Sequence, residues 1–522
     1  MNRIVVPLAL LLFLPLFGLA APFLFPNFST HTDLMASGTL SHLWNFVLGG
    51  YIASTLVLIF GVGLGVFILG VGNAWIIASY DFPGKKVFEW ALILPLAVPT
   101  YVMAYLFVDV LQFSGPLQSA LRTLLGADTL WFFPDPRSMS GAIWSFSFCL
   151  FPYVYLITRT AFLERSGRLI EVSETLGYSP LQGFIKLVLP MARPAIFAGM
   201  ALALMEVLAD FGAVSYFGVQ TFATGIFKAW LSFGDRLAAV QLALGLLSFV
   251  LLIFFMEQSS RSKLRYAATS QSKPLPKVLR GKAAYIAFAF CGLTLLFGFL
   301  LPAFALLQLL YQQGFSVDAR YFDWLRNSLS VSMVTAIISV VLALFFAYAV
   351  RLNAQLAWVN RLLGFGYALP GAVLAIGILS FLEIFQLAWW MSASMLVLVY
   401  AYLVRFLSSS LQSVEAGLTR ITPSMDGSAA LLGLSKIQIL RRVHVPLLKR
   451  SLITAGLFVF VDVMKELPAT LLLRPFNFDT LAVATYQLAA DERLAELALP
   501  SLTIVLVGLF PVLILSRVIS KS

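Results

Sequence analysis

Acidic residues inside apolar segments are the side chains of this 522-residue chain best suited to chemistry. Glu206 and Asp210 lie in one apolar segment, and Asp462 and Glu466 lie in another, each pair four positions apart. Because residues four apart share a helix face, each segment would present two carboxylates together. Hard cations prefer oxygen ligands, so the four residues are candidates for a cation path or a metal site.

The same residues also fit a structural role. Lys465 stands between Asp462 and Glu466 and could pair with either to hold its helix against neighbouring helices. Asp210 and Glu466 could cap irregular backbone or lie near the external surface. Carboxylates inside a membrane are costly, which favours function, but structural ion pairs occur there too. Two interpretations therefore stay open, structural ion pairs or a translocation path lined by Glu206, Asp210, Asp462, Lys465 and Glu466.

The composition predicts that helices crossing a membrane position these residues. Hydrophobic residues make up 60% of the chain and charged residues 11%, with a mean hydropathy of +0.92. Soluble globular proteins carry far more charge, so we expect an all-α polytopic membrane protein. A span needs about 20 apolar residues. About twelve transmembrane helices are predicted, near 4–25, 45–72, 87–112, 140–163, 194–214, 238–257, 283–311, 327–351, 363–386, 390–410, 452–472 and 495–517.

The net charge of +11 follows the predicted topology. With twelve spans and both termini in the cytoplasm, most Lys and Arg fall in cytoplasmic segments, as the positive-inside rule requires. The largest of these segments are 160–193, 258–282 and 405–450. The charge therefore gives no reason to expect a nucleic-acid partner. The two cysteines, Cys149 and Cys291, lie in different apolar runs and suggest neither a disulfide nor a metal site.

A polar segment occurs twice, once in each half, at a constant offset of 256 positions. Gly177 precedes Pro190 by the same distance as Gly433 precedes Pro446. We expect each copy to form a short helix, a tight glycine turn and a second amphipathic helix that the proline ends. Two copies with one internal spacing indicate equivalent docking elements. Below they are called the first repeat element (171–190) and the second repeat element (427–446); three more pairs match at this offset, Leu176/Leu432, Ser179/Ser435 and Gln182/Gln438.

The chain divides into two halves at a basic segment rich in serine and proline. We predict a first membrane domain at 1–257, a cytoplasmic linker at 258–282 and a second membrane domain at 283–522. Six spans starting from the same side in each half predict two pseudo-symmetric six-helix halves in a parallel repeat. Pro99 and Pro370 also match between the halves, although not at the offset of 256.

The repeat elements resemble the EAA signature of ABC-importer permeases. Glu171, Gly177 and Pro190 match that signature, but in the second copy Gly427 takes the glutamate's place and Asp426 stands one residue earlier. In that family the element is a coupling helix that inserts into a cleft of a cytoplasmic ATPase. The resemblance implies that the ATPase-coupling residues are Glu171, Glu174, Gly177, Pro190, Asp426, Gly433 and Pro446.

A longer resemblance covers nearly the whole chain. The stretches 203–212, 216–225 and 461–480 look like the fused, two-domain permeases of bacterial ferric-iron ABC importers. The resemblance implies the type I permease fold, an inner-membrane location, two cytoplasmic ATPase subunits, a periplasmic iron-binding protein and one copy of this chain per complex. It also implies that ATP and Mg²⁺ bind to the partners and that this chain binds no cofactor. Sister families carry thiamine, polyamines or oxyanions, which remain alternative substrates.

Other classes of protein explain the sequence less well. The chain has no Gly-x-x-x-x-Gly-Lys-Ser/Thr phosphate loop, so we expect a transport subunit and not an ATP-hydrolysing enzyme. A twelve-helix secondary transporter would not need a repeated cytoplasmic docking element. A structural or assembly protein would not need acidic residues at matched positions in two spans.

Overall fold

The computed structural model describes residues 2–24, 43–126, 128, 133–262, 277–314, 317–385 and 394–519. Most of the predicted linker, and the start of the span predicted at 390–410, lie outside these ranges. The described part is almost entirely helical. Two short strands, β1 (Tyr80–Asp81) and β2 (Lys277–Val278), pair in parallel.

The helices follow one another in a similar order in both halves. From residue 2 to 262 they are α1 (Asn2–Leu11), α2 (Leu14–Leu24), η2 (Leu43–Val47), α4 (Leu48–Ser79), α5 (Lys85–Ala91), η3 (Leu94–Ala97), α6 (Thr100–Leu111), α7 (Pro116–Leu125), α8 (Met139–Thr175), α9 (Pro180–Gly183), η4 (Phe184–Val188), α10 (Leu189–Ala209), α11 (Gly212–Tyr216), α12 (Phe222–Phe227), η5 (Lys228–Ser232) and α13 (Arg236–Ser262).

The remaining helices begin at residue 282. They are α14 (Lys282–Leu295), η6 (Leu296–Leu300), α15 (Leu301–Gln312), α16 (Arg320–Leu352), η7 (Ala354–Leu356), α17 (Ala357–Leu363), η8 (Gly364–Ala368), α18 (Gly371–Ile384), α20 (Met395–Leu418), α21 (Pro423–Leu431), α22 (Lys436–Ile439), η9 (Leu440–His444), α23 (Val445–Met464), α24 (Pro468–Leu473), α25 (Leu481–Ala490) and α26 (Leu494–Ile519).

The membrane-spanning character predicted from composition is confirmed, but the number twelve is not. Among the described residues, eight helices are long and apolar enough to cross a membrane, and three bent pairs raise the total to at most eleven. The span predicted at 452–472 differs most, because α23 ends at Met464 and a separate short helix, α24, follows. Likewise, the span predicted at 194–214 belongs to a helix that runs from Leu181 to Ala209.

Two predicted spans, 87–112 and 363–386, are sharply bent at matched prolines. The two helical pieces meet at 97° around Pro99 and at 109° around Pro370. Both prolines adopt extended backbone, with ψ of 145° and 140°, and each stands directly before the next helix. A proline also disfavours helical backbone in the residue before it, and Val98 and Leu369 are extended accordingly. The two bends are therefore specified locally by Pro99 and Pro370, which stand 271 positions apart.

The helices form two compact units, and each unit contains segments of both sequence halves. Unit 1 comprises Met1–Ser41, Ile226–Leu247 and Val317–Thr485, and unit 2 comprises His42–Gly225, Ser248–Ser316 and Tyr486–Ser522. The segment that opens each half thus packs in the unit built mainly from the other half. This packing is distinct from the sequence repeat, for which 1–257 and 283–522 remain the predicted limits.

The exchange of the N-terminal segment rests on a close helix crossing within unit 1. Helix α2 packs on α18, where Gly18 and Gly377 meet. A Cβ on Gly18 would lie 1.9 Å from the Gly377 carbonyl oxygen, and one on Gly377 would lie 2.1 Å from the Pro15 carbonyl oxygen. Only glycine permits this approach of the two backbones.

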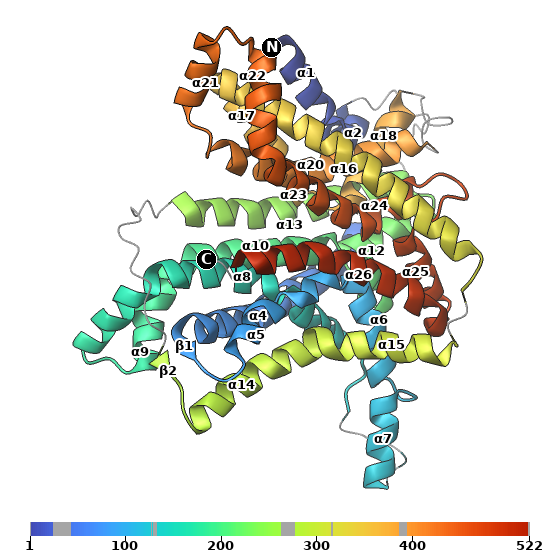
Figure 1. Cartoon of the computed structure of the whole chain (residues 1–522). Helices are drawn as coiled ribbons and strands as arrows, with labels where there is room; N and C mark the ends of the chain where they lie inside the picture. The colour runs from blue at the N-terminus through green and yellow to red at the C-terminus, as the bar shows by residue number, and fades with distance from the viewer. Residues whose placement is uncertain are drawn as a thin grey trace. The chain divides into compact units, whose positions relative to one another are not determined.

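Each unit is built around a matched set of three packed helices. In unit 2 these are α4, α8 and α10, and in unit 1 they are α16, α20 and α23 (Figure 1). The last helix of each set carries Glu206 or Asp462 near its end, and Asp210 or Glu466 follows the helix. The segment before it contains one repeat element. The two sets therefore position every candidate residue that the sequence singled out.

Candidate functional site

The first repeat element turns at a glycine and restarts at a capped helix. Helix α8 ends at Thr175, and Gly177 adopts a left-handed backbone with φ of +73°. Ser179 and Gln182 then cap each other's backbone: Gln182 N donates to Ser179 Oγ at 3.3 Å, and Ser179 N donates to Gln182 Oε1 at 3.1 Å. This reciprocal capping box fixes the start of α9. The side chains of Glu171 and Glu174 lie outside the described part.

The second repeat element has the same construction. Helix α21 ends at Leu431, and Gly433 has φ of +80°. Gln438 N donates to Ser435 Oγ at 3.4 Å, and Ser435 N donates to Gln438 Oε1 at 2.8 Å. The residues that matched in sequence thus perform the same local task in both copies. The predicted order of helix, glycine turn and second helix is confirmed.

The predicted role of the two prolines is wrong. Pro190 and Pro446 do not end the second helix of their elements. Each stands in the first turn of a long helix, α10 or α23, that continues from the element through a π-helical turn, η4 or η9. A proline inside a helix lacks an N–H and clashes with the carbonyl four residues earlier, and a widened turn accommodates both defects. The repeat elements are therefore continuous with helices α10 and α23.

Large apolar side chains are exposed at matched positions of the two elements. Leu176 is 58% exposed and its counterpart Leu432 is 82% exposed. Leu181 and Ile437, which also stand 256 apart, are 67% and 64% exposed. Exposed apolar side chains on an otherwise polar segment are typical of a protein-binding surface. Each element therefore presents two apolar contacts flanking its glycine turn.

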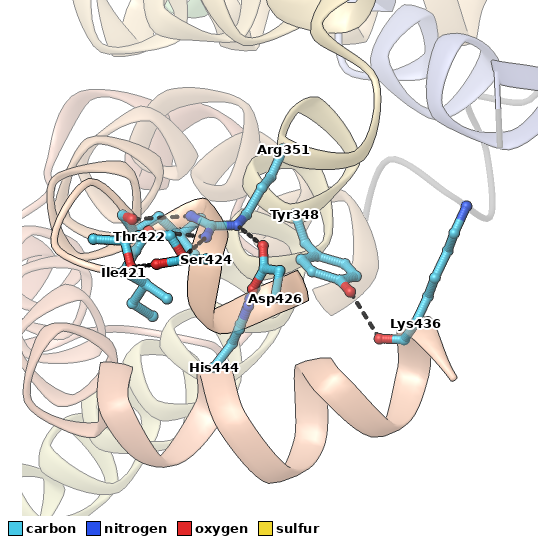
Figure 2. Close-up of polar contacts among 9 residues, drawn as sticks. Tyr348, Arg351, Ile421, Thr422, Ser424, Asp426, Lys436 and His444 are labelled. Atoms are coloured by element: carbon cyan, nitrogen blue, oxygen red, sulfur yellow. Dashed lines mark hydrogen bonds and ion pairs between the residues drawn. The ribbon is translucent and has the colours of Figure 1, made fainter. Parts of the chain in front are cut away.

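Asp426 of the second element makes its contacts within the chain. Arg351 Nε donates to Asp426 Oδ2 at 2.8 Å, and His444 Nε2 lies 2.6 Å from Asp426 Oδ1 (Figure 2). Burial raises the pKa of Asp426, but the hydrogen bonds from Arg351 and His444 outweigh burial and hold the pKa below its ordinary value. A carboxyl group whose pKa is lowered by folding stabilises the fold at any pH above its unfolded-state pKa. This stabilisation is lost as the pH falls through the folded-state pKa. Asp426 therefore stays ionised at neutral pH.

Asp210 and Glu466 have equivalent places in their units. Asp210 directly follows α10, and its Oδ1 accepts the backbone N–H of Ala213 at 2.8 Å at the start of α11. Glu466 follows α23, and its Oε1 accepts the backbone N–H of Ala469 at 2.9 Å in α24. Each carboxylate thus caps the short helix that follows it. This capping is one of the two roles that the sequence left open.

The two capping carboxylates differ in their charge partners. Arg405 Nη1 donates to Glu466 Oε1 at 2.9 Å, and both side chains are almost fully buried. Among the described residues Asp210 forms no ion pair; its second oxygen accepts a hydrogen bond from Thr100 Oγ1. Thr100 directly follows Pro99, and the corresponding Gly371 leaves the room that Glu466 and Arg405 occupy. Asp210 and Glu466 therefore occupy equivalent local positions, but among the described residues only Glu466 has a charged partner.

Glu206, Asp462 and Lys465 lie one helical turn or less before these caps. Glu206 and Asp462 are partly exposed on α10 and α23. Lys465 Nζ lies 3.2 Å from Asp462 Oδ1, an ion pair that the sequence left open as an alternative. In the part of the chain that the structure describes, no three His, Cys, Asp or Glu side chains gather closely enough to hold a metal ion. The geometry offers carboxylates at matched positions but no assembled metal centre.

Three of the residues that organise these sites were not predicted. They are Arg351, Arg405 and His444, to which the sequence patterns assign no site. The signal that could have found Arg405 is its place inside an apolar run, where an unpaired charge is costly. For His444 the signal is its position within a repeat element, where the first copy has Val188.

The described helices form a multi-pass membrane protein with two structurally matched polar elements, an arrangement that fits a membrane transport subunit. Residues 70–266 match the model of the family described as binding-protein-dependent transport system inner membrane component. This match and the apolar helices together indicate a multi-pass inner-membrane component of a binding-protein-dependent transport system.

Among individual proteins, one relative matches nearly the whole chain and others match only about a third of it. The chain is similar to the Fe(3+)-transport system permease protein FbpB 2 of Haemophilus influenzae, with 28% identity over 527 residues that cover 98% of both chains. It is 31% identical over 153 residues to the sulfate transport system permease protein CysT of Salmonella typhimurium, covering 29% of this chain and 52% of that protein. The molybdenum transport system permease protein ModB of Escherichia coli is 28% identical over 174 residues, which are 33% of this chain and 71% of that protein.

Proposed function

We propose that this chain is the fused permease of an ATP-driven importer for ferric iron. The observation that carries the proposal is the pair of repeat elements, which share a left-handed glycine, a capping box and two exposed apolar side chains. Two such elements in one chain fit two copies of one partner. In an importer of this family that partner is the cytoplasmic ATPase, and a periplasmic binding protein delivers the substrate. ATP and Mg²⁺ then belong to the ATPase subunits, with one copy of this chain per complex.

The choice of iron rests on the extent of the match to a ferric-iron permease. That match covers 98% of this chain, whereas the sulfate and molybdenum permeases match only 29% and 33%. An oxyanion, thiamine or a polyamine is the alternative substrate. The four acidic residues of α10, α23 and their caps favour a cation over an oxyanion, because carboxylates repel anions.

In the proposed mechanism, closure of the ATPase pair moves both repeat elements together. Each element continues without a break into α10 or α23, so its movement reaches the helix that carries the acidic residues. The membrane helices then alternate between inward-facing and outward-facing states. Coupling requires that ATP and the loaded binding protein each favour one of these states.

Uptake of labelled iron into vesicles tests the substrate and the energy source. Vesicles contain the reconstituted complex of this chain with its ATPase, and loaded binding protein is added outside. We expect ATP-dependent uptake of ferric iron that excess sulfate, molybdate, thiamine or spermidine does not reduce. Uptake driven by a proton or sodium gradient without ATP would identify a secondary transporter instead. ATP-dependent uptake of one of the competitors, and not of iron, would assign another substrate.

The path role of the acidic residues predicts a loss of uptake without a loss of assembly. We expect Glu206→Ala and Asp462→Ala each to lower iron uptake about tenfold, because each removes a carboxylate from the proposed cation path. Purification of the complex with its ATPase measures assembly in parallel. The double variant Asp462→Ala/Lys465→Ala separates the two roles of Asp462. If Asp462 serves only to neutralise Lys465, the double variant recovers uptake; if Asp462 lines the path, uptake stays low.

A further inference from the structure

The second repeat element is held by Arg351, the last-turn arginine of α16. Besides its bond to Asp426, the Arg351 guanidinium donates from Nη1 to the Leu418 carbonyl at 3.1 Å and from Nη2 to the Ile421 carbonyl at 2.9 Å. One side chain thus joins the end of α20, the connection that follows it and the first turn of α21. The planar guanidinium can serve these acceptors together, which a lysine ammonium cannot do with the same geometry.

His444 and Tyr348 extend the contact to the far side of the element. His444 is fully buried in η9, and its Nε2–H donates to Asp426, because the ionised carboxylate can only accept hydrogen bonds. Tyr348 packs edge-on against the His444 ring at 5.2 Å. The Tyr348 hydroxyl donates to the Lys436 carbonyl at 2.7 Å at the start of α22 (Figure 2). Below, the four residues Tyr348, Arg351, Asp426 and His444 are called the polar anchor.

The positions of the first half that correspond in sequence to the polar anchor carry no charged side chain. At the offset of 256 positions, Asp426 corresponds to Ile170 and His444 to Val188. At the offset of 271 that relates the two bend prolines, Arg351 corresponds to Tyr80 and Tyr348 to Ile77. No charged residue stands at any of these positions.

An aromatic cluster occupies the corresponding place in the first half. Trp75 near the end of α4 lies 4.6 Å, between ring centroids, from Phe184 of the π-helical turn η4. Trp75 also packs against Phe162 at 5.8 Å and Tyr80 at 6.0 Å. These aromatic pairs join α4, α8 and η4, as the polar anchor joins α16, α21 and η9. The aromatic cluster is defined as Trp75, Tyr80, Phe162 and Phe184.

We propose that the polar anchor positions the second repeat element and that Asp426 is not an ATPase contact. Both Asp426 oxygens are engaged by side chains of the same chain, and Gly427 leaves the signature glutamate position without a side chain. The second element therefore meets the ATPase without a carboxylate at the signature glutamate position, where the sequence of the first element has Glu171. The two repeat elements are held by different contacts, hydrogen-bonded charged groups at the second element and aromatic packing at the first. The inference rests on the proposed docking function of the repeat elements.

Hydrogen exchange of the full-length chain in nanodiscs tests the anchor without any partner. We expect Asp426→Asn and Arg351→Met to speed amide exchange of residues 423–435 about tenfold, because the contacts that close this segment are lost. Residues 176–189 keep their exchange rates. Arg420→Met, which removes an exposed arginine of the same loop, is the matched control and changes neither segment. Unchanged exchange of 423–435 in both Asp426→Asn and Arg351→Met overturns the proposal.

Two further variants separate positioning from general destabilisation. Arg351→Lys keeps the positive charge beside Asp426 but loses the planar set of guanidinium donors. The exchange rate of residues 423–435 in this variant should therefore lie between those of the wild type and Arg351→Met. Trp75→Ala should speed exchange of 176–189 and leave 423–435 unchanged, the mirror image of the Asp426 result. If Trp75→Ala and Asp426→Asn each loosen both segments equally, the two anchors are not separate and the inference fails.

Binding of the chain to its co-produced ATPase distinguishes failure of the anchor from failure of the docking assignment. Leu432→Asp places a charge on the exposed docking surface and should weaken ATPase binding without changing exchange in the free chain. If Leu432→Asp leaves ATPase binding unaffected, the docking assignment is wrong. The exchange measurement on Asp426→Asn still tests the polar anchor independently. If Asp426→Asn weakens ATPase binding but leaves exchange of 423–435 unchanged, Asp426 contacts the ATPase directly and the anchor is refuted.

Discussion

We expect replacement of Gly433 by valine to abolish stimulation of the partner ATPase and replacement by asparagine to keep most of it. Gly433 has φ of +80°, a conformation that costs an ordinary residue about 1–2 kcal/mol and a β-branched residue more. Valine therefore forces the turn into another conformation and separates Leu432 from the capped helix that starts at Ser435. The measurement is ATP hydrolysis by the reconstituted complex with and without loaded binding protein.

The asparagine variant is the matched control for the glycine prediction. Among the described residues, chain neighbours aside, no atom lies within 4 Å of a Cβ built on Gly177 or Gly433, so added volume alone meets no obstacle there. Asparagine tolerates left-handed backbone better than other residues with a side chain, so Gly433→Asn tests size at nearly constant conformation. The same pair of substitutions at Gly177 should give the same ranking. Full stimulation in both valine variants would refute the assignment of these turns to coupling.

Neutralising Glu466 should destabilise the permease far more than neutralising Asp210. Glu466→Gln leaves the Arg405 guanidinium buried without a counter-charge, and breaking a buried ion pair costs about 3–5 kcal/mol. Asp210→Asn removes only charge-assisted hydrogen bonds to Thr100 and the backbone, worth about 1–3 kcal/mol. Thermal unfolding of the purified chain in nanodiscs measures both. We expect Glu466→Gln to lower the unfolding temperature by the larger amount.

A double variant shows whether Arg405 is the cause. Arg405→Met/Glu466→Leu replaces the buried pair by apolar side chains of similar size and should recover most of the lost stability, because no unpaired charge remains. Iron uptake by the same variants adds a second result. Recovered stability with abolished uptake would assign the pair a role in transport beyond packing. Equal destabilisation by Glu466→Gln and Asp210→Asn would contradict the charge difference between the units.

Much of the candidate site could be predicted because the sequence repeats internally, so each matched residue of one half could be compared with its counterpart in the other. The offset that relates Gly177 to Gly433 also relates Asp210 to Glu466, and both pairs occupy equivalent local structures. A residue placed by its neighbours in sequence, such as a turn glycine or a helix cap, is specified locally and repeats when the sequence repeats. The bends at Pro99 and Pro370 were visible as a match but were not read as bends, although the constraint is equally local.

The helix ends and the ion pairs of the candidate site could not be predicted. Hydropathy does not mark the helix ends, and the ion pairs join residues far apart in sequence. The span limits at 194–214 and 452–472 were wrong because hydropathy alone does not reveal that Asp210 and Glu466 interrupt the helices to cap the next ones. The Arg405–Glu466 pair joins positions that no sequence spacing relates. The side chains of Glu171 and Glu174, predicted to couple to the ATPase, remain predictions.

Composition and the internal repeat thus predict a multi-pass membrane protein with two equivalent elements and two matched acidic pairs, since each of these signals is carried by residues close together in the chain. Tertiary structure alone shows that Arg351 and His444 meet Asp426, that an aromatic cluster replaces them in the first half, and that the segment opening each half packs in the unit built mainly from the other. Those contacts join segments tens to hundreds of residues apart. Their energies depend on burial and distance in the folded chain, which sequence spacing does not report.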